Sequence, residues 1–517
     1  NLELLLNGFV KSQRLIHFCA GIFLGISGKD TVNLSGFQNH IGSDFRTSQS
    51  CSSIRCEERI TGAGSKNHDA AFLQMAQCFA ANVRLGNLVD IQGALDTGFN
   101  TGVSQCILKC HCVHAGGQHA HIVAGGAIHT GSQYVNQANT QELDAWTRFD
   151  AGALTVTDLS NPADIRLALR PDNASDFAQW FYFRLQGAAY QNCVMHFENA
   201  AQAAYPDGWE DYQACASYDR QNWFRVPTRY ENGVLTIEHT PLANSIYYAY
   251  FEPYSSEQHL NLLGDAQGSG LCQIDDLGST VEGRDMNLLT IGNQVQSDLK
   301  VWVIARQHPG ETMAEWFVEG LLARLLDPQD ATARALLDQA TFYIVPNMNP
   351  DGSALGNLRT NAAGANLNRE WLAPTLEKSP EVYYVREKMR ATGVDLFLDI
   401  HGDEAIPYVF VAGTEGVPAY NERIAALEAQ FKAAFAAASP DFQDEHGYEK
   451  DSPGQANLSM ATAWVGENFG CLAYTLEMPF KDNHNLPDDD FGWNGQRSLR
   501  LGEAVLSAVL NVLPDLR

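Results

Sequence analysis

A histidine and a glutamate stand three residues apart at the end of an apolar run. The run is "VWVIA" at 301–305, and the two polar residues that follow it are His308 and Glu311. Its composition predicts a buried strand. Pro309 and Gly310 lie between the two side chains and oppose continuation into a regular helix. A tight turn there can direct an imidazole and a carboxylate toward one point.

A second histidine, His401, follows another apolar run, "VDLFLDI" at 394–400. Catalytic zinc is typically held by three protein ligands and keeps one position for water. Two histidines and one glutamate form such a set in hydrolytic zinc enzymes. We therefore expect His308, Glu311 and His401 to bind one Zn²⁺ per chain.

Further polar residues suit the remaining steps of a hydrolysis. Glu477 ends the apolar run "CLAYTLE", and loss of hydration there raises the pKa of a carboxyl group toward the range of a general base. Arg359 is suited to stabilise a carbonyl oxygen that gains negative charge. Asn368 and Arg369 form a pair suited to a carboxylate, which a guanidinium can bind through two hydrogen bonds.

Strand and helix patterns alternate from about residue 260 onward. Strands are predicted within 299–307, 340–350, 394–403 and 471–479, and amphipathic helices within 312–326, 381–393, 419–438 and 498–513. This alternation predicts an α/β layer with a mostly parallel sheet. The polar residues described above follow its strands, at the edge where open α/β sheets bind ligands.

Two other regions precede this layer. Short alternating or aromatic runs between 142 and 260 predict an all-β sandwich. Residues 1–140 contain no proline and no tryptophan, and the ligand spacing around Cys110 and Cys112 is not that of a zinc finger. We expect three parts: an unassigned extension (1–140), disordered or not native to the mature protein, a β-sandwich domain (141–260) and a catalytic domain (261–517).

The charge of the chain restricts its partners. The formal net charge is −27, from 34 Lys and Arg against 61 Asp and Glu. A polyanion of this kind repels nucleic acid and anionic membrane surfaces. No apolar stretch reaches the length of a membrane span. We expect neither nucleic acid nor membrane as a partner.

Taken together, the motifs HPGE, NPDG, GNLR, NLNREW, DIHGD and TLEMPF resemble the M14 zinc carboxypeptidases. More narrowly, the chain is similar to the cytosolic carboxypeptidase subfamily in its bacterial form, over roughly 142–517. The resemblance implies a mixed sheet flanked by helices after a β-sandwich, the roles inferred above for all seven site residues, and a cytoplasmic location. It also implies removal of a C-terminal residue from a peptide or protein, by a zinc-bound water with Glu477 as general base.

Some features depart from the family pattern or stay open. Many relatives have Asp where this chain has Asn366, whose amide oxygen can still accept a hydrogen bond from His308 but carries no charge. The flexible capping tyrosine of the family has no clear match, and Tyr448 is the nearest candidate. Acidic C-terminal residues are one candidate substrate class, for which Lys481 or Arg390 would supply the positive charge.

Two other functions compete with the carboxypeptidase. A zinc-dependent deacylase or amidase acting on N-acyl amino acids would keep the zinc and Glu477 but would not need Asn368 and Arg369. A non-catalytic peptide-binding module built on a degenerate enzyme would be expected to lose the base or a metal ligand first. The intact residues favour the metallocarboxypeptidase.

Overall fold

The structure is a computed structural model that describes residues 89–90, 108–110, 122–124, 143–292 and 298–517. The chain divides into two compact units, Asn1–Ala138 and Asn139–Arg517. In the first unit the backbone is described for three strands that form an antiparallel sheet, β1 (Val89–Asp90), β2 (Leu108–Cys110) and β3 (Ile122–Ala124). The expectations for 1–140 otherwise lie outside the described residues.

The second unit begins with two five-stranded sheets. One has the order β10-β9-β13-β7-β4 and the other the order β11-β12-β8-β6-β5. Their strands are β4 (Asp144–Trp146), β5 (Thr155–Asp158), β6 (Ile165–Ala168), β7 (Tyr182–Gln186), β8 (Cys193–Phe197), β9 (Ala214–Ser217), β10 (Trp223–Val226), β11 (Thr228–Glu231), β12 (Val234–His239) and β13 (Ser245–Ala249). Aromatic side chains fill much of the space between the sheets, as with the buried Phe181, Phe183 and Phe197.

A seven-stranded sheet follows, in the order β14-β15-β17-β16-β18-β20-β19. Its strands are β14 (Cys272–Ser279), β15 (Asp285–Ile291), β16 (Leu299–Ala305), β17 (Ala340–Val345), β18 (Leu396–Asp403), β19 (Phe410–Ala412) and β20 (Leu472–Pro479). The four central strands, β17, β16, β18 and β20, are parallel. The three remaining pairs are antiparallel, so the sheet is mixed, as the family resemblance implies. The prediction of a mostly parallel sheet holds for the centre of the sheet and fails at its two edges.

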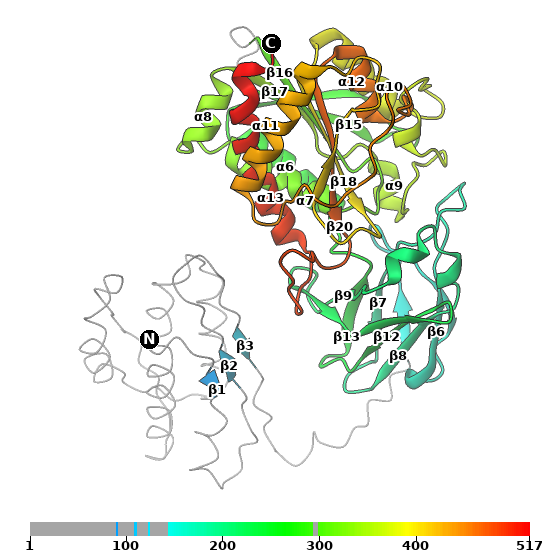
Figure 1. The fold of residues 1–517 in the computed structure, drawn as a ribbon. Helices are drawn as coiled ribbons and strands as arrows, with labels where there is room; N and C mark the ends of the chain where they lie inside the picture. Colours follow the sequence, from blue (N-terminus) through cyan, green and yellow to red (C-terminus); the bar gives the residue numbers. More distant parts are fainter. Residues whose placement is uncertain (1–88, 91–107, 111–121, 125–142, 293–297) are drawn as a thin grey trace, which may run out of the picture. The chain divides into compact units, whose positions relative to one another are not determined.

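Helices cover both faces of this sheet (Figure 1). They are α6 (Ser256–Gly268), α7 (Met313–Leu325), α8 (Ala331–Leu337), α9 (Pro350–Leu355), α10 (Pro380–Thr392), α11 (Glu422–Ala438), α12 (Ala461–Phe469) and α13 (Gly495–Val512). Successive residues of a strand point to opposite faces. Val301 and Val303 accordingly pack in the core that includes α7, α11 and α13, while Trp302 and Ile304 pack in the core that includes α10 and α12.

The helices and central strands predicted from the sequence are confirmed. Asparagine caps begin three of the helices: Asn349, Asn421 and Asn494 accept hydrogen bonds from the first turns of α9, α11 and α13. Within the described ranges, no helix combines the length and apolarity needed to cross a membrane. Because the four central strands are parallel, their carboxyl ends lie at one edge of the sheet, and polar side chains follow there.

Candidate active site

All seven residues predicted for the site line one cavity of about 650 Å³. This volume is in the usual range for small-ligand sites. The cavity lies at the carboxyl ends of the parallel strands, where β18 and β20 place His401 directly opposite Glu477 in register. His401 and Glu477 therefore lie within the last residues of their strands rather than beyond them.

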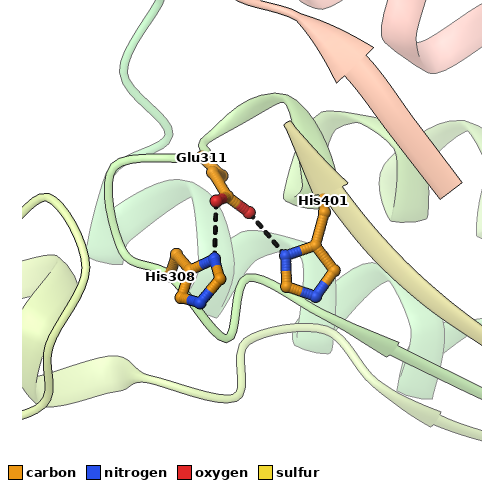
Figure 2. A group of neighbouring side chains, drawn as sticks. All are labelled: His308, Glu311 and His401. Atoms are coloured by element: carbon orange, nitrogen blue, oxygen red, sulfur yellow. Dashed lines mark hydrogen bonds and ion pairs between the residues drawn. The ribbon is translucent and has the colours of Figure 1, made fainter. Parts of the chain in front are cut away.

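Glu311 lies between the two histidine rings (Figure 2). Its Oε1 is 2.6 Å from Nδ1 of His308, and its Oε2 is 2.7 Å from Nδ1 of His401. The potential ligand atoms of the three residues all lie within 4.8 Å of one another, and all three side chains are buried. The structure thus brings together the three residues that the sequence predicts as metal ligands.

A tight turn between β16 and α7 carries His308 and Glu311. The Glu311 amide donates to the His308 carbonyl (3.1 Å), so the backbone reverses within three residues. The Gly310 amide donates to the carbonyl of Leu358 (2.8 Å), and a Cβ at Gly310 would lie only 3.0 Å from that oxygen. Glycine is therefore required by the close approach of the neighbouring chain segment.

The residue that enters this turn, Arg306, has a left-handed backbone (φ 58°). That conformation is uncommon for a non-glycine residue and needs support from its surroundings. The buried Arg306 side chain donates to the carbonyl of Pro309 (2.9 Å) and pairs with Glu315 (2.7 Å), which also contacts His259 (2.6 Å). This buried network holds the turn in place.

The outward nitrogens of the two histidines have different partners. Nε2 of His308 lies 3.1 Å from the amide oxygen of Asn366, which confirms the predicted contact. Nε2 of His401 lies 2.9 Å from Oδ1 of Asp399, whose other oxygen accepts from Gln307 (2.7 Å). One imidazole thus faces a neutral amide and the other a carboxylate, and such outer partners set the tautomer and basicity of a metal ligand.

The electrostatics of the three side chains favour a cation between them. Burial and the nearby Arg359 charge lower the pKa of His308 to about 3, so its ring is neutral, as a metal ligand must be. Burial alone would lower the pKa of His401, but the carboxylates of Asp399 and Glu311 raise it well above the usual value. Buried histidine and carboxylate donors that converge in this way fit a zinc ion.

Glu477 lies beside this group and is 5% exposed. Burial raises its pKa well above the usual value, against an opposing effect of His401. Its Oε2 is buried without a hydrogen-bond partner within the described part of the chain, while Oε1 lies 3.1 Å from the Tyr448 hydroxyl. That hydroxyl also lies 2.6 Å from Asp403, so the tyrosine that the sequence offered only as a candidate does reach the site.

The other three predicted residues also line the cavity. Arg359 places Nη1 3.9 Å from Oε1 of Glu311. Asn368 accepts from the amide of Ala461 (2.8 Å) through its side-chain oxygen, and its amide nitrogen lies 3.5 Å from Nε2 of His401. Arg369 is exposed, and one of its nitrogens donates to the Asn368 carbonyl (2.7 Å).

The two cations considered for an acidic substrate do not line the cavity. Nζ of Lys481 is buried and donates to the carbonyl of Glu210 (2.6 Å), and Arg390 pairs with Glu387 on the surface of α10. Lys432 and Lys450 line the cavity instead, but each already pairs with a carboxylate, Asp444 at 2.8 Å and Glu415 at 2.7 Å.

Several residues of the site were not predicted. Asp399 could have been predicted from the sequence, because it precedes His401 by two residues on the same strand and such residues point to the same face of a sheet. Tyr205 and the buried Glu404 also line the cavity, and burial raises the pKa of Glu404 to about 8. Tyr205 comes from the β-sandwich region, and no local pattern links it to a site more than a hundred residues away.

The sequence of the chain matches known protein families and relatives. Residues 146–251 match the cytosolic carboxypeptidase N-terminal domain family, and residues 259–496 match the zinc carboxypeptidase family, Peptidase M14. An uncharacterized protein of Zymomonas mobilis is 48% identical over 369 residues, which cover 71% of this chain and 96% of that protein.

Solved structures agree with this assignment. A metallo-carboxypeptidase from Burkholderia cenocepacia is 57% identical (TM-score 0.71) and covers 72% of this chain and 99% of its own. A metallo-carboxypeptidase from Pseudomonas aeruginosa, solved in complex with (2-guanidinoethylmercapto)succinic acid, is 49% identical (TM-score 0.71) and covers 72% of this chain and all of its own. The chain therefore belongs to the M14 zinc carboxypeptidase family and is a peptidase hydrolase with the N-terminal domain of the cytosolic carboxypeptidases.

Proposed function

We propose that the protein is a zinc metallocarboxypeptidase that removes the C-terminal amino acid from peptides or proteins, with its β-sandwich domain at 141–260 and its catalytic domain at 261–517. The observation that carries the proposal is the convergence of His308, Glu311 and His401 beside Glu477 in one cavity. When bound by these three side chains, one zinc ion would supply positive charge that makes a water more acidic and polarises a carbonyl group.

The side chains of this chain account for the other requirements of the reaction. Asn368 and Arg369 would bind the free C-terminal carboxylate and so restrict cleavage to the last peptide bond. Arg359 would stabilise the negative charge on the oxygen of the scissile carbonyl as water adds to its carbon. Glu477 would take a proton from that water and deliver it to the leaving nitrogen when the C–N bond breaks. The products are a shortened peptide and one free amino acid.

Substitution of Glu477 tests this proposal. Peptides that differ only in the last residue are incubated with the wild type, with Glu477→Gln and with the control variant Glu445→Gln. Glu445 is an exposed carboxylate of the same cavity. The masses of the products are measured by mass spectrometry. We expect loss of a single residue in the wild type and the Glu445→Gln control, and a loss of activity of about 10³-fold or more in Glu477→Gln at unchanged zinc content. Unchanged turnover in Glu477→Gln would remove the proposed base.

The same peptide panel addresses the preferred residue. An acidic preference would have to use Lys432 or Lys450, since these lysines line the cavity, and either would have to exchange its present carboxylate partner for the substrate. Nine Asp and Glu side chains line the cavity against four Lys and Arg, so the overall potential does not itself favour an acidic side chain. If acidic residues are preferred, Lys432→Met or Lys450→Met should reduce that preference.

Hydrolysis of N-acyl amino acids is the second candidate function. Such substrates also present a free carboxylate to Asn368 and Arg369 and would use the same Glu477. The two functions differ in substrate length, so rates for N-acetyl amino acids and for peptides of two to six residues distinguish them. If the protein is a carboxypeptidase, we expect faster turnover of the longer peptides, because the cavity extends beyond Asn368 and Arg369 to Glu415 and Asp451.

A further inference from the structure

Segment 355–364, which carries Arg359, is held mainly from outside the α/β layer. It begins at Leu355, the last residue of the short helix α9, and contains no other helix or strand. A segment of this kind has few backbone hydrogen bonds to fix it, so its position depends on contacts with other parts of the protein. Residues 170–177 of the β-sandwich region supply many of these contacts.

Asp172 makes the central contact. Its carboxylate accepts from three successive backbone amides, those of Leu358 (2.6 Å), Arg359 (2.8 Å) and Thr360 (2.9 Å), and from the Thr360 hydroxyl (3.0 Å). The side chain is buried, with 5% of the residue exposed. Charge-assisted bonds of this kind are about twice as strong as neutral ones. Three of them to consecutive amides fix the backbone direction at Arg359.

Neighbours of Asp172 hold both ends of the segment. Arg170 donates to the carbonyls of Leu355 (2.6 Å) and Gly356 (3.1 Å), and Asn173 donates to the carbonyl of Ala362 (2.6 Å). The backbone amide of Asn173 donates to Oδ1 of Asn357 (3.2 Å), and Nδ2 of Asn357 donates to Oδ1 of Asn173.

The backbones of the two regions approach closely at two glycines. A Cβ at Gly356 would lie 2.6 Å from the carbonyl oxygen of Ala151, and a Cβ at Gly364 would lie 2.2 Å from that of Ala174. Both glycines have positive φ values, 69° and 75°, so an L side chain would be strained there as well as crowded. The segment is thus fitted to the β-sandwich along its length.

The β-sandwich also contacts the guanidinium group of Arg359 itself. The guanidinium carbon lies 5.2 Å from the ring centre of Tyr205 and 5.8 Å from that of Phe177. Both rings are within the range of cation–π attraction. The β-sandwich therefore contacts Arg359 at its backbone, through Asp172, and at its charged end, through the two rings.

We propose that Asp172 is the positioning residue that sets Arg359 against the scissile carbonyl, so that the β-sandwich is a working part of the active site. The inference rests on the function proposed above. Asp172 does not line the cavity and acts through the backbone, because its carboxylate accepts from the amide of Arg359 and from the amides on either side of it. Displacing a catalytic group by about 1 Å costs up to 10²-fold in rate.

A double-mutant cycle in the full-length, zinc-loaded protein tests the proposal. The substitution Asp172→Asn replaces one carboxylate oxygen by an NH₂ group. The backbone amides that donate to that oxygen in the wild type would then lie against another donor. For Asp172→Asn we expect kcat to fall roughly tenfold to hundredfold with little change in KM, since Arg359 acts on the transition state. Asp176→Asn, an exposed aspartate four residues further along, is the matched control and should behave as the wild type.

The Arg359→Ala background separates positioning from general damage. Arg359→Ala alone should lower kcat by about 10²- to 10³-fold. Asp172→Asn should add less than about twofold in that background, because the group it positions is absent. An equal loss in both backgrounds, or no loss in the wild-type background, would overturn the proposal. If Asp172→Asn lowers the melting temperature too far for kinetics, Asn173→Ala provides a milder release of the same segment.

Amide hydrogen exchange gives a readout that needs no turnover. The peptide covering 355–364 should exchange faster in Asp172→Asn than in the wild type or in Asp176→Asn, while peptides from β16 and β18 stay unchanged. Unchanged exchange in 355–364 would overturn the inference. A wild type with no peptidase activity would contradict the proposed function alone, and the exchange experiment would still decide whether Asp172 holds the segment.

Discussion

The seven site residues fall into two groups that are built differently. The sheet-borne group lies on β18, β20 and the turn after β16: His308, Glu311, His401 and Glu477. The loop-borne group lies on a stretch that contains only short helices: Arg359, Asn368 and Arg369. Backbone pairing of β18 with β20 fixes His401 and Glu477, and the buried Arg306 network holds the turn with His308 and Glu311. Side chains of the β-sandwich hold the segment around Arg359 instead.

This difference indicates which properties can change separately. A change in the sheet-borne group alters the proposed metal site or the base, because His308, Glu311 and His401 share one buried network and Glu477 lies opposite His401. A change in the loop-borne group alters substrate binding or transition-state charge and leaves the metal in place. The experiments below test this separation, from the largest expected effect to the smallest.

His401→Ala should have the largest effect. It removes one of the three ligands, takes the imidazole partner from the buried carboxylate of Asp399, and leaves that of Glu311 with His308 alone. We expect loss of zinc and of activity, and destabilisation by about 3 kcal/mol, as found when buried ion pairs lose one partner. Metal analysis and thermal unfolding measure both. Retention of one zinc per chain would break the proposed distinction between the groups.

Arg369→Ala should change substrate binding without changing the metal. Hydrogen bonds to a charged group contribute up to about 3 kcal/mol, so kcat/KM on a peptide should fall by roughly 100-fold, mainly through KM. The matched substrate is the same peptide with an amidated C-terminus, which should already be poor for the wild type and lose little more in the variant. A fall in zinc content would show that the two groups are not separable.

Within the sheet-borne group, the two histidines provide a finer contrast. Asp399→Asn removes the carboxylate beside His401 and should weaken zinc binding by roughly 10- to 100-fold. Asn366→Asp places a carboxylate beside His308 and should strengthen it by a smaller factor. Competition with a chelator measures both affinities. Equal affinities in the two variants and the wild type would show that these outer partners do not tune the ligands.

The pH profile of kcat/KM tests the base. A general base must be unprotonated, and burial raises the pKa of Glu477, so activity should rise with pH and fall about tenfold for each unit below the controlling pKa. Bound zinc would lower that pKa from its value in the metal-free protein, but the acid limb should remain. Glu445→Gln should keep the limb unchanged. A profile with no acid limb would contradict the role of Glu477.

Much of the site could be predicted because its residues follow apolar runs. The strands ending near His308, His401 and Glu477 have strong apolar patterns, and parallel strands bring their carboxyl ends together. The order of strands at the sheet edges could not be predicted in this way, since β14 is partly exposed, β19 has only three residues, and β15, although mostly buried, pairs antiparallel with both neighbours. The mixed character of the sheet came from the resemblance alone.

Long-range contacts account for the remaining differences. Asp172 and Tyr205 reach the site from the β-sandwich, and their neighbours in sequence carry no sign of it. Lys481 follows Glu477 by only four residues, yet its amine contacts the β-sandwich instead of the cavity. Tyr448 lies on a segment without regular structure, and only the folded chain places its hydroxyl beside Glu477.

Anomalous diffraction at the zinc edge, from crystals of the zinc-loaded protein, tests the central claim most directly. We predict one zinc peak per chain, about 2.0–2.2 Å from Nδ1 of His308, Nδ1 of His401 and a carboxylate oxygen of Glu311. A peak elsewhere in the chain, or an ion held by fewer than these three side chains, would contradict the account.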